Sequence, residues 1–181
     1  MFGGIAGVTL AKWTPKHGKF RDPDEAAIET AVAECRTPLA KAPGDLEEVR
    51  EGLARLMWDD AGIFRDAASL KRALAGLDDL DKTLDGVGVE ARDLAYNLAW
   101  HDWLNLKNLI LVSKVIAAAA LARDDSRGAH WRADFPETGD LATSAFTSAR
   151  LVVGKIDVAM RPVKFTRVRP GETLIKDTAA E

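Results

Sequence analysis

EARDLAYNLAWHDWLNLKNLILVSKVIAAAALAR, residues 90–123, runs without a glycine or a proline and decides the fold. Because these two residues are the strongest helix breakers, the stretch predicts one continuous helix from Glu90 to Arg123. At about 1.5 Å per residue it would be about 50 Å long, the longest element of the chain. The residues predicted to form its apolar face are Leu94, Leu98, Leu109, Val112, Ile116 and Ala120.

Two shorter amphipathic patterns precede this helix. One begins at Asp45, and another restarts at Asp66 after a break at Gly62 and ends at Gly86 and Gly88. Their apolar stripes are Leu46, Val49, Leu53, Leu56 and Met57 in the first, and Leu70, Leu74, Leu77, Leu80 and Leu84 in the second. Short loops between helices favour antiparallel packing. The predicted fold is therefore mainly α: an antiparallel, spectrin-repeat-like three-helix bundle over residues 41–136, then a loop and a small β-hairpin appendage.

The first 40 residues differ from the bundle in composition. Residues 1–10, MFGGIAGVTL, are apolar and small but lack the positive start of a secretory signal. Such a segment is expected to dock on another surface, or alternatively to pack on the chain's own core. Residues 22–25, DPDE, predict a helix start capped by Asp22, with the helix running to Arg36 and stopping before Pro38. Residues 37–44 then read as a linker.

Residues 137–181 are expected to form the hairpin and a basic tail. Val, Ile and alternation predict strands over 144–153 and 156–163, joined by a turn at Gly154-Lys155. Basic residues outnumber acidic ones between Arg150 and Lys176, so this segment could touch nucleic acid, an anionic lipid surface or an acidic partner. With no aromatic residue there beyond Phe165, we expect a charged strand edge rather than nucleic-acid binding.

Composition excludes several classes of function. The chain has 181 residues, 47% of them hydrophobic and 29% charged, with a net charge of −3, so it is neither disordered nor a polycation. Its single cysteine, Cys35, rules out an intrachain disulfide or a Cys-rich metal site and is expected to be inert. The three histidines, at positions 17, 101 and 130, are too far apart to predict a metal site. No apolar run approaches the ~20 residues that span a bilayer, so no direct membrane insertion is expected.

Residues 126–132, SRGAHWR, form the most unusual constellation. Functionally, the arginines could hold a carboxylate through two parallel hydrogen bonds. Structurally, Arg127 could instead cap the preceding helix, and Trp131 could close the end of the bundle. The structural interpretation is favoured, and no catalytic, cofactor-binding or metal-binding residue is assigned, because no nucleophile–base set and no G-x-G-x-x-G motif after a strand is visible.

Two segments, NLAWHDWLNLKNLI at 97–110 and ARDDSRGAHWRADFP at 122–136, resemble the C-terminal domain of succinate dehydrogenase and fumarate reductase flavoproteins. Residues 57–65, MWDDAGIFR, look like that domain's first-helix signature, and Arg161-Pro162-Val163 is similar to its hairpin exit. Residues 2–7 resemble the end of the family's FAD-binding domain. The L-aspartate oxidases share the SRGAH string in looser form, but the run Trp100–Leu104 favours the succinate and fumarate enzymes.

The resemblance implies an FAD-dependent oxidoreductase that moves a hydride between flavin and a C4 dicarboxylate. In that family the flavin-binding and substrate-binding residues lie in preceding domains, so residues 1–40 are expected to be the end of the FAD-binding domain plus a linker helix. Arg127, His130 and Arg132 are then expected to lie at a domain interface. The resemblance also implies an iron–sulfur partner subunit and a cytoplasmic location, peripheral at the inner membrane through partners. The alternative is a free-standing helical interaction module without a redox role.

Overall fold

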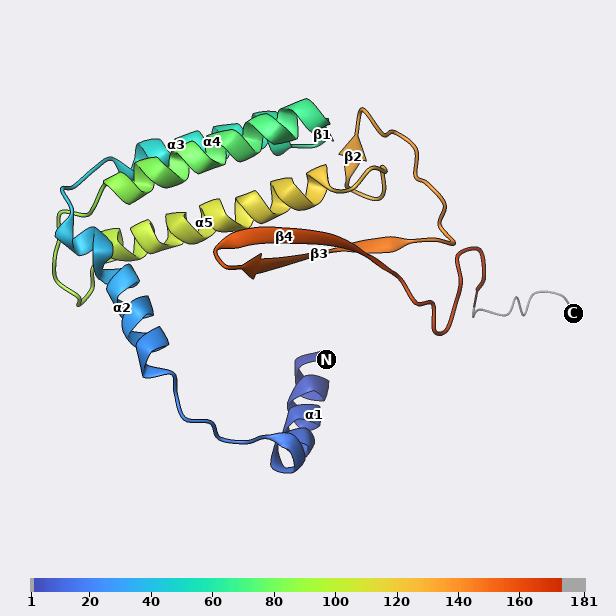
Figure 1. The fold of residues 1–181 in the computed structure, drawn as a ribbon, viewed down its shortest axis with the longest axis horizontal. Helices are drawn as coiled ribbons and strands as arrows, with labels where there is room; N and C mark the ends of the chain where they lie inside the picture. The colour runs from blue at the N-terminus through green and yellow to red at the C-terminus, as the bar shows by residue number, and fades with distance from the viewer. Residues whose placement is uncertain (1, 174–181) are drawn as a thin grey trace, which may run out of the picture. The chain divides into compact units, whose positions relative to one another are not determined.

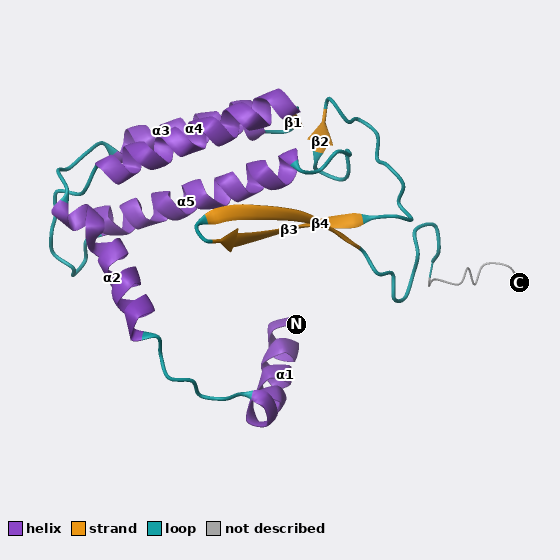
Figure 2. Cartoon of the chain, viewed as in Figure 1, coloured by secondary structure: helices purple, strands orange, loops and turns teal. Residues whose placement is uncertain are grey.

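The structure, a computed structural model, describes residues 2–173. The chain divides into two compact units, residues 1–36 and residues 37–181. Along the described residues the order of elements is α1, α2, α3, β1, α4, α5, β2, β3 and β4 (Figure 1). The prediction of a mainly helical fold with a small β appendage is confirmed, as the distribution of helix and strand in Figure 2 shows.

The first unit contains α1, Phe2–His17, and the start of α2, Glu25–Ala40. In α1 the rings of Trp13 and His17 stack with centroids 4.8 Å apart. None of its residues is buried, and Phe2 is 82% exposed. The expectation that this apolar segment docks on another surface stays a prediction.

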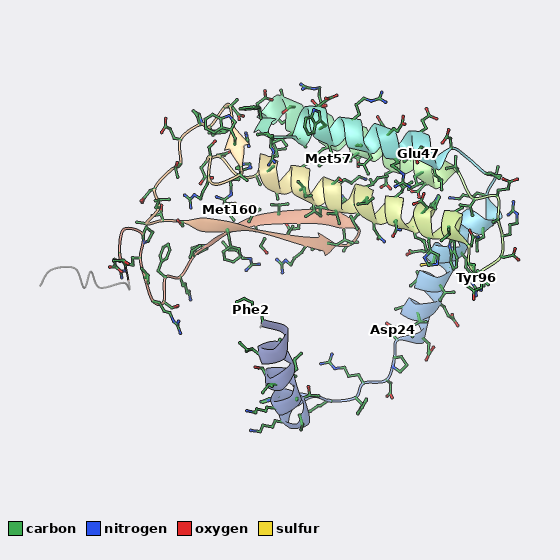
Figure 3. All side chains as sticks on the ribbon, turned by 180° about the vertical axis from the view of Figure 1, so that it is seen from behind. Phe2, Asp24, Glu47, Met57, Tyr96 and Met160 are labelled. Carbon is green, nitrogen blue, oxygen red and sulfur yellow. The ribbon has the colours of Figure 1, made fainter. Side chains whose placement is uncertain are left out.

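The predicted limits of α2 were wrong at both ends. The helix is capped by Asp24, labelled in Figure 3, whose Oδ1 accepts from the amide of Ala27 at 3.1 Å; Asp22 was the predicted cap. At the other end the helix continues past Pro38 to Ala40. A proline removes one helical donor, but Pro38 lies in the last turn, is fully buried, and accepts from the amide of Val89 at 3.1 Å. Tertiary contacts therefore hold a helix that the proline was expected to end.

The bundle consists of α3 (Leu46–Ala61), α4 (Ala67–Gly86) and α5 (Leu98–Leu121), which lie side by side in Figure 1. Asp45 caps α3 by accepting from two backbone amides, and Asp66 with Ser69 forms a capping box at the start of α4. The two predicted stripes supply much of the core. Fully or almost fully buried side chains are Val49, Leu53, Leu70, Leu77, Leu84, Trp103, Leu106 and Ile110.

The third helix was predicted to begin at Glu90, but α5 begins at Leu98. Tyr96, labelled in Figure 3, has a φ of 57°. This value lies in the left-handed region, so the right-handed helix cannot extend back through Tyr96 toward Glu90. Asn97 then caps α5, because its Oδ1 accepts from the amide of Trp100 at 2.9 Å. The Asn97 Nδ2 also donates to the carbonyls of Ala91 and Asp93, which holds residues 91–97 as a loop.

The predicted apolar face of α5 was also wrong, apart from Ala120. The buried positions are Trp103, Leu106, Ile110, Ser113, Ala117 and Ala120. Of the predicted positions, Leu98 is 81% exposed, and Leu94, Leu109, Val112 and Ile116 are about half exposed. Because α5 is apolar around most of its circumference, periodicity could not identify which side faces the core.

By length and composition alone, α5 is long and apolar enough to cross a membrane. The expectation that no apolar segment reaches such a length was therefore wrong. In this chain, however, α5 is tied to α4 by charge: Lys107 pairs with Asp81 at 2.6 Å, and Lys114 pairs with Asp81 at 2.7 Å. Burial alone would lower the pKa of Lys107, but its hydrogen bonds to Asp81 and Asp85 leave that pKa raised.

The β-hairpin consists of β3, Ala145–Val152, and β4, Lys155–Pro162. Its turn is Val153-Gly154, one residue earlier than predicted, with φ values of 49° and 73°. An unpredicted parallel pair joins β1, Phe64–Arg65, to β2, Trp131–Arg132, and so connects the α3–α4 loop to the segment after α5. The last part of the predicted basic tail, residues 174–181, lies outside the described residues.

Candidate functional site

The SRGAH segment forms a tight turn directly after α5. The amide of Arg127 donates to the carbonyl of His130 at 2.8 Å, and the amide of His130 donates back at 3.0 Å. Gly128 takes a φ of 58°, which a side chain would make costly. Because the turn fixes the backbone at Arg127 and His130, it also fixes the points from which their two side chains project.

Arg132 is the most buried charged residue described, with a side chain 1% exposed. Its Nη1 donates to the carbonyls of Ala120, Leu121 and Arg123 at 3.0–3.1 Å. These carbonyls end α5, where positive charge is favoured by the helix dipole. Helix capping was expected of Arg127, but Arg132 performs it.

Asp134 neutralises Arg132 and attaches the loop to a second helix. Its two carboxylate oxygens accept from Nε and Nη2 of Arg132, each at 2.7 Å. Asp134 Oδ2 also accepts from the amide of Ala67, at the start of α4. The hydrogen bond from Arg132 holds the pKa of Asp134 well below its ordinary value. One ion pair thus connects the end of α5 to the beginning of α4.

Arg127 and Arg123 hold the entrance of the hairpin. Arg127 donates to Ser144 Oγ at 2.9 Å and to the carbonyl of Thr138 at 3.0 Å. Arg123 donates to the carbonyl of Ala145 at 2.6 Å and pairs with Asp125 at 3.0 Å. The Nε atom of Arg127 is buried and has no hydrogen-bond partner within residues 2–173.

His130 lies beside Arg65, a residue for which the sequence predicted no role of its own. The Nδ1 atom of His130 and Nη1 of Arg65 are 3.3 Å apart. Burial lowers the pKa of His130, and the positive charges of Arg65, Arg123 and Arg132 lower it further, against an opposing effect of the Arg123 backbone. These surroundings therefore favour the neutral form of the His130 ring. The signal for Arg65 lay in the MWDDAGIFR string, which ends on it.

A hollow of about 600 Å³ opens beside this loop, and Trp58, Ile63, Phe64, Arg65 and Ala129 are among the residues that line it. Trp131 was expected to close the end of the bundle. It is instead 41% exposed and pairs with Phe64 across the β1–β2 ladder. This end of the bundle thus presents the aromatic side chains of Trp58 and Phe64 beside Arg65.

Within the part of the chain that the structure describes, no group of His, Cys, Asp or Glu side chains could hold a metal ion. The arginine side chains act here as hydrogen-bond donors. The hydrogen bonds of Arg132 are all made within the bundle and its loop. Arg127 instead reaches the edge of the hairpin, and Arg65 lines the hollow.

Comparison with known proteins identifies the family. Residues 50–175 match the family described as fumarate reductase flavoprotein C-term. An uncharacterized FAD-dependent oxidoreductase of Methanocaldococcus jannaschii is 34% identical over 140 residues, covering 76% of this chain and 24% of that protein. The fumarate reductase flavoprotein subunit of Mycobacterium tuberculosis is 28% identical over 183 residues, covering 95% of this chain and 31% of that protein.

The fold is similar to that of a solved structure. A chain of the Mycobacterium smegmatis Sdh1 complex in the apo form superposes with a TM-score of 0.80 at 30% identity, covering 93% of this chain and 29% of that chain. The present chain thus spans about a quarter to a third of the length of these relatives. It belongs to the family of C-terminal domains of succinate dehydrogenase and fumarate reductase flavoprotein subunits.

Proposed function

We propose that this chain supports the flavin and dicarboxylate site of an FAD-dependent succinate dehydrogenase or fumarate reductase and performs no bond-making itself. The observation that carries the proposal is that the arginines at residues 123–132 are hydrogen-bonded within this chain. Arg123, Arg127 and Arg132 are hydrogen-bonded to carbonyls and side chains of the same chain, as a rigid support requires. The hydride transfer between FAD and a C4 dicarboxylate is assigned to the polypeptide that the longer relatives carry outside the matched region.

The residues described here do not fit FAD. Dinucleotide sites of the Rossmann type need a strand, a glycine-rich turn and a helix in a parallel sheet. Over residues 2–173 the sheets are the two-residue pair β1–β2 and the hairpin β3–β4. We therefore assign no cofactor contact to this chain and place the flavin in the neighbouring domain.

Support of a redox site depends on rigidity and on exclusion of water. Arg132 fixes the end of α5, and the turn then presents Arg127 and His130 from a backbone that cannot move independently. The buried atoms Nε of Arg127 and Nε2 of His130 have no hydrogen-bond partner among the described residues. We assign both side chains to the interface with the FAD-binding domain, and Arg132 to positioning them.

The proposal extends to organisation and partners. Residues 1–40 would complete the FAD-binding domain and link it to the bundle at 41–136, and residues 137–181 would form the hairpin and tail. The FAD-binding domain of the same flavoprotein is the main partner, with an iron–sulfur subunit as a second. The assembly would be cytoplasmic and peripheral at the inner membrane through its partner subunits.

The test is Arg127→Ala in the flavoprotein that contains this chain, with Arg150→Ala as the control. Arg150 is an exposed arginine of β3 whose nearest carboxylate, that of Asp157, lies 3.8 Å away. We expect Arg127→Ala to lower the thermal midpoint and the FAD content per chain while KM for the dicarboxylate stays unchanged, and Arg150→Ala to change neither. A raised KM with normal stability and flavin content would indicate direct substrate contact and contradict the supporting role.

A further inference from the structure

Arg65 differs from the other buried or partly buried arginines because no carboxylate of the described residues neutralises it. Each of the others has an aspartate within ion-pair distance: Arg50 with Asp102, Arg123 and Arg127 with Asp125, and Arg132 with Asp134. Arg65 has no such carboxylate partner among residues 2–173. It donates from Nε to the carbonyl of Gly62 at 2.5 Å and lies beside His130.

The arrangement around Arg65 disfavours the charged form of its side chain. Burial lowers the pKa of Arg65, and no nearby acidic group offsets the effect. A guanidinium that is half-buried without a counter-charge is unfavourable unless something else supplies the charge. The fork of N–H groups of arginine suits a carboxylate in particular.

The surroundings of Arg65 are those of an interface centre. The hollow that it lines also contains Trp58, Ile63 and Phe64, which are 77%, 68% and 76% exposed. Large apolar side chains around an arginine are typical of the residues that dominate binding energy at protein interfaces. A ligand for this hollow should therefore carry one negative charge among apolar groups.

We propose that Arg65 is an anchor for an aspartate or glutamate of the same flavoprotein's remaining polypeptide, which inserts into the hollow beside Trp58 and Phe64. This inference rests on the proposed function and names the contact through which the support would act. The relatives that match this chain are three to four times its length. The rest of such a polypeptide is the partner present at the highest effective concentration.

One carboxylate of this chain could compete for Arg65. Asp59 also lines the hollow, although no hydrogen bond or ion pair joins it to Arg65 in this structure. If Asp59 were the true counter-charge, a change of side-chain rotamer would bring the two together and no external carboxylate would be needed. The experiment must therefore distinguish Asp59 from an acidic residue outside residues 1–181.

The first test uses Arg65→Lys in the flavoprotein that contains this chain, treated with a carbodiimide. This reagent joins an amine to a carboxylate only when they are in contact, so it traps the partner of position 65. The expected product is a crosslink from position 65 to an aspartate or glutamate outside residues 1–181, mapped by mass spectrometry and unchanged when Asp59→Asn is added. A crosslink to Asp59, or none from position 65, would overturn the proposal.

The second test is hydroxyl-radical footprinting of Trp58 and Phe64. Both should be labelled rapidly in the 181-residue chain and protected in the flavoprotein. Arg65→Gln should then raise their labelling about tenfold, because loss of a charge-assisted hydrogen bond shifts the docked-to-open ratio by about that factor or more. Arg72→Gln is the matched control, since Arg72 pairs with Asp60 outside the lining of the hollow.

The outcomes separate the anchor from the proposed function. If the Arg127–His130 turn is protected in the flavoprotein while Trp58 and Phe64 label as in the isolated chain, the domain docks but the Arg65 anchor is wrong. If neither region is protected, the supporting role and the anchor both fail.

Discussion

Arg132 and Asp134 form a bidentate ion pair, with Nε to Oδ1 and Nη2 to Oδ2 both at 2.7 Å, while Nη1 of the same guanidinium meets three carbonyls at the end of α5. The planar fork of the arginine satisfies both groups at once, which a lysine ammonium cannot do in the same geometry. This relationship makes Arg132 the residue through which the loop, α5 and α4 are joined.

Arg132→Lys should therefore destabilise the chain although it keeps the charge. We expect a loss of about 2–4 kcal/mol of unfolding free energy, since buried charge-assisted hydrogen bonds contribute about 1.5–3 kcal/mol each and Lys can replace only part of them. Urea unfolding followed by circular dichroism would measure it. Arg150→Lys, on the exposed hairpin, should change stability by less than about 0.5 kcal/mol. Equal changes in unfolding free energy for the two substitutions would show that the hydrogen bonds of Arg132 do not stabilise the chain.

The depressed pKa of Asp134 predicts a sensitivity to acid. The folded-state pKa lies below the unfolded value, so the unfolded chain binds its proton at higher pH. The stabilisation by the ionised carboxylate is fully present above the ordinary pKa of 3.8 and is lost as pH falls through the folded pKa. Thermal midpoints measured from pH 6 down to pH 2.5, taken as about the lower limit of a usable buffer range, should fall below pH ~4.

Asp134→Asn supplies the comparison for this pH dependence. It should be less stable than the native chain at pH 6. The stability gap should narrow as the pH falls below 4, because the Asp134 carboxylate of the unfolded native chain then binds a proton and the unfolded state gains stability relative to the folded one. A gap that stays constant over the whole range would mean that Asp134 does not titrate with folding.

Much of the bundle could be predicted because its first two helices are amphipathic. In α3 and α4, leucines at three- and four-residue steps are separated by charged residues, so Leu53, Leu70 and Leu77 could be assigned to the core and are buried. In α5 the same argument failed, because Leu109 and Ile110 are neighbours in an apolar run and only one of them is buried. Local hydropathy cannot choose between two apolar sides; contacts with α3 and α4 make that choice.

The sequence identified residues 126–132 as a candidate site but did not predict the role of each arginine in it. The SRGAH segment stood out by composition, yet which arginine caps α5 depends on a turn at Gly128 that reverses the chain and brings Arg132 back under the helix end. The contact between Arg65 and His130 was missed because the two residues lie 65 positions apart in the sequence. Spacing along the chain carries no information about a contact of that separation.

Two glycines near the end of α4 should respond differently to alanine. A Cβ at Gly88 would overlap the carbonyl oxygen of Pro38 and lie close to Lys41, whose backbone cannot easily move, whereas a Cβ at Gly86 meets nothing within 4 Å. Gly88→Ala should cost about 1–3 kcal/mol through overpacking. Gly86→Ala should gain up to about 1 kcal/mol, because it lies in a helix and loses chain entropy in the unfolded state.

The measurement is the difference in urea midpoint between the two variants, which share the same chemical change. Gly88 also donates to the carbonyl of Ala42 at 2.7 Å, so its displacement should raise amide exchange at the end of α2. Stability equal to that of the native chain in both variants would show that residues 38–42 adjust freely around position 88.

The turn of the hairpin holds a β-branched residue in an unfavourable conformation. Val153 has a φ of 49° and precedes Gly154 at 73°, a pattern that hairpin turns usually fill with Asn-Gly. Because Asn tolerates the left-handed region, Val153→Asn should stabilise the hairpin by about 1 kcal/mol, or about fivefold in amide protection of β3 and β4. Hydrogen exchange read by mass spectrometry would measure this. Val152→Asn, one residue earlier in β3, replaces a strand former without relieving the turn and should lower protection; if both variants lower it, Val153 is not strained.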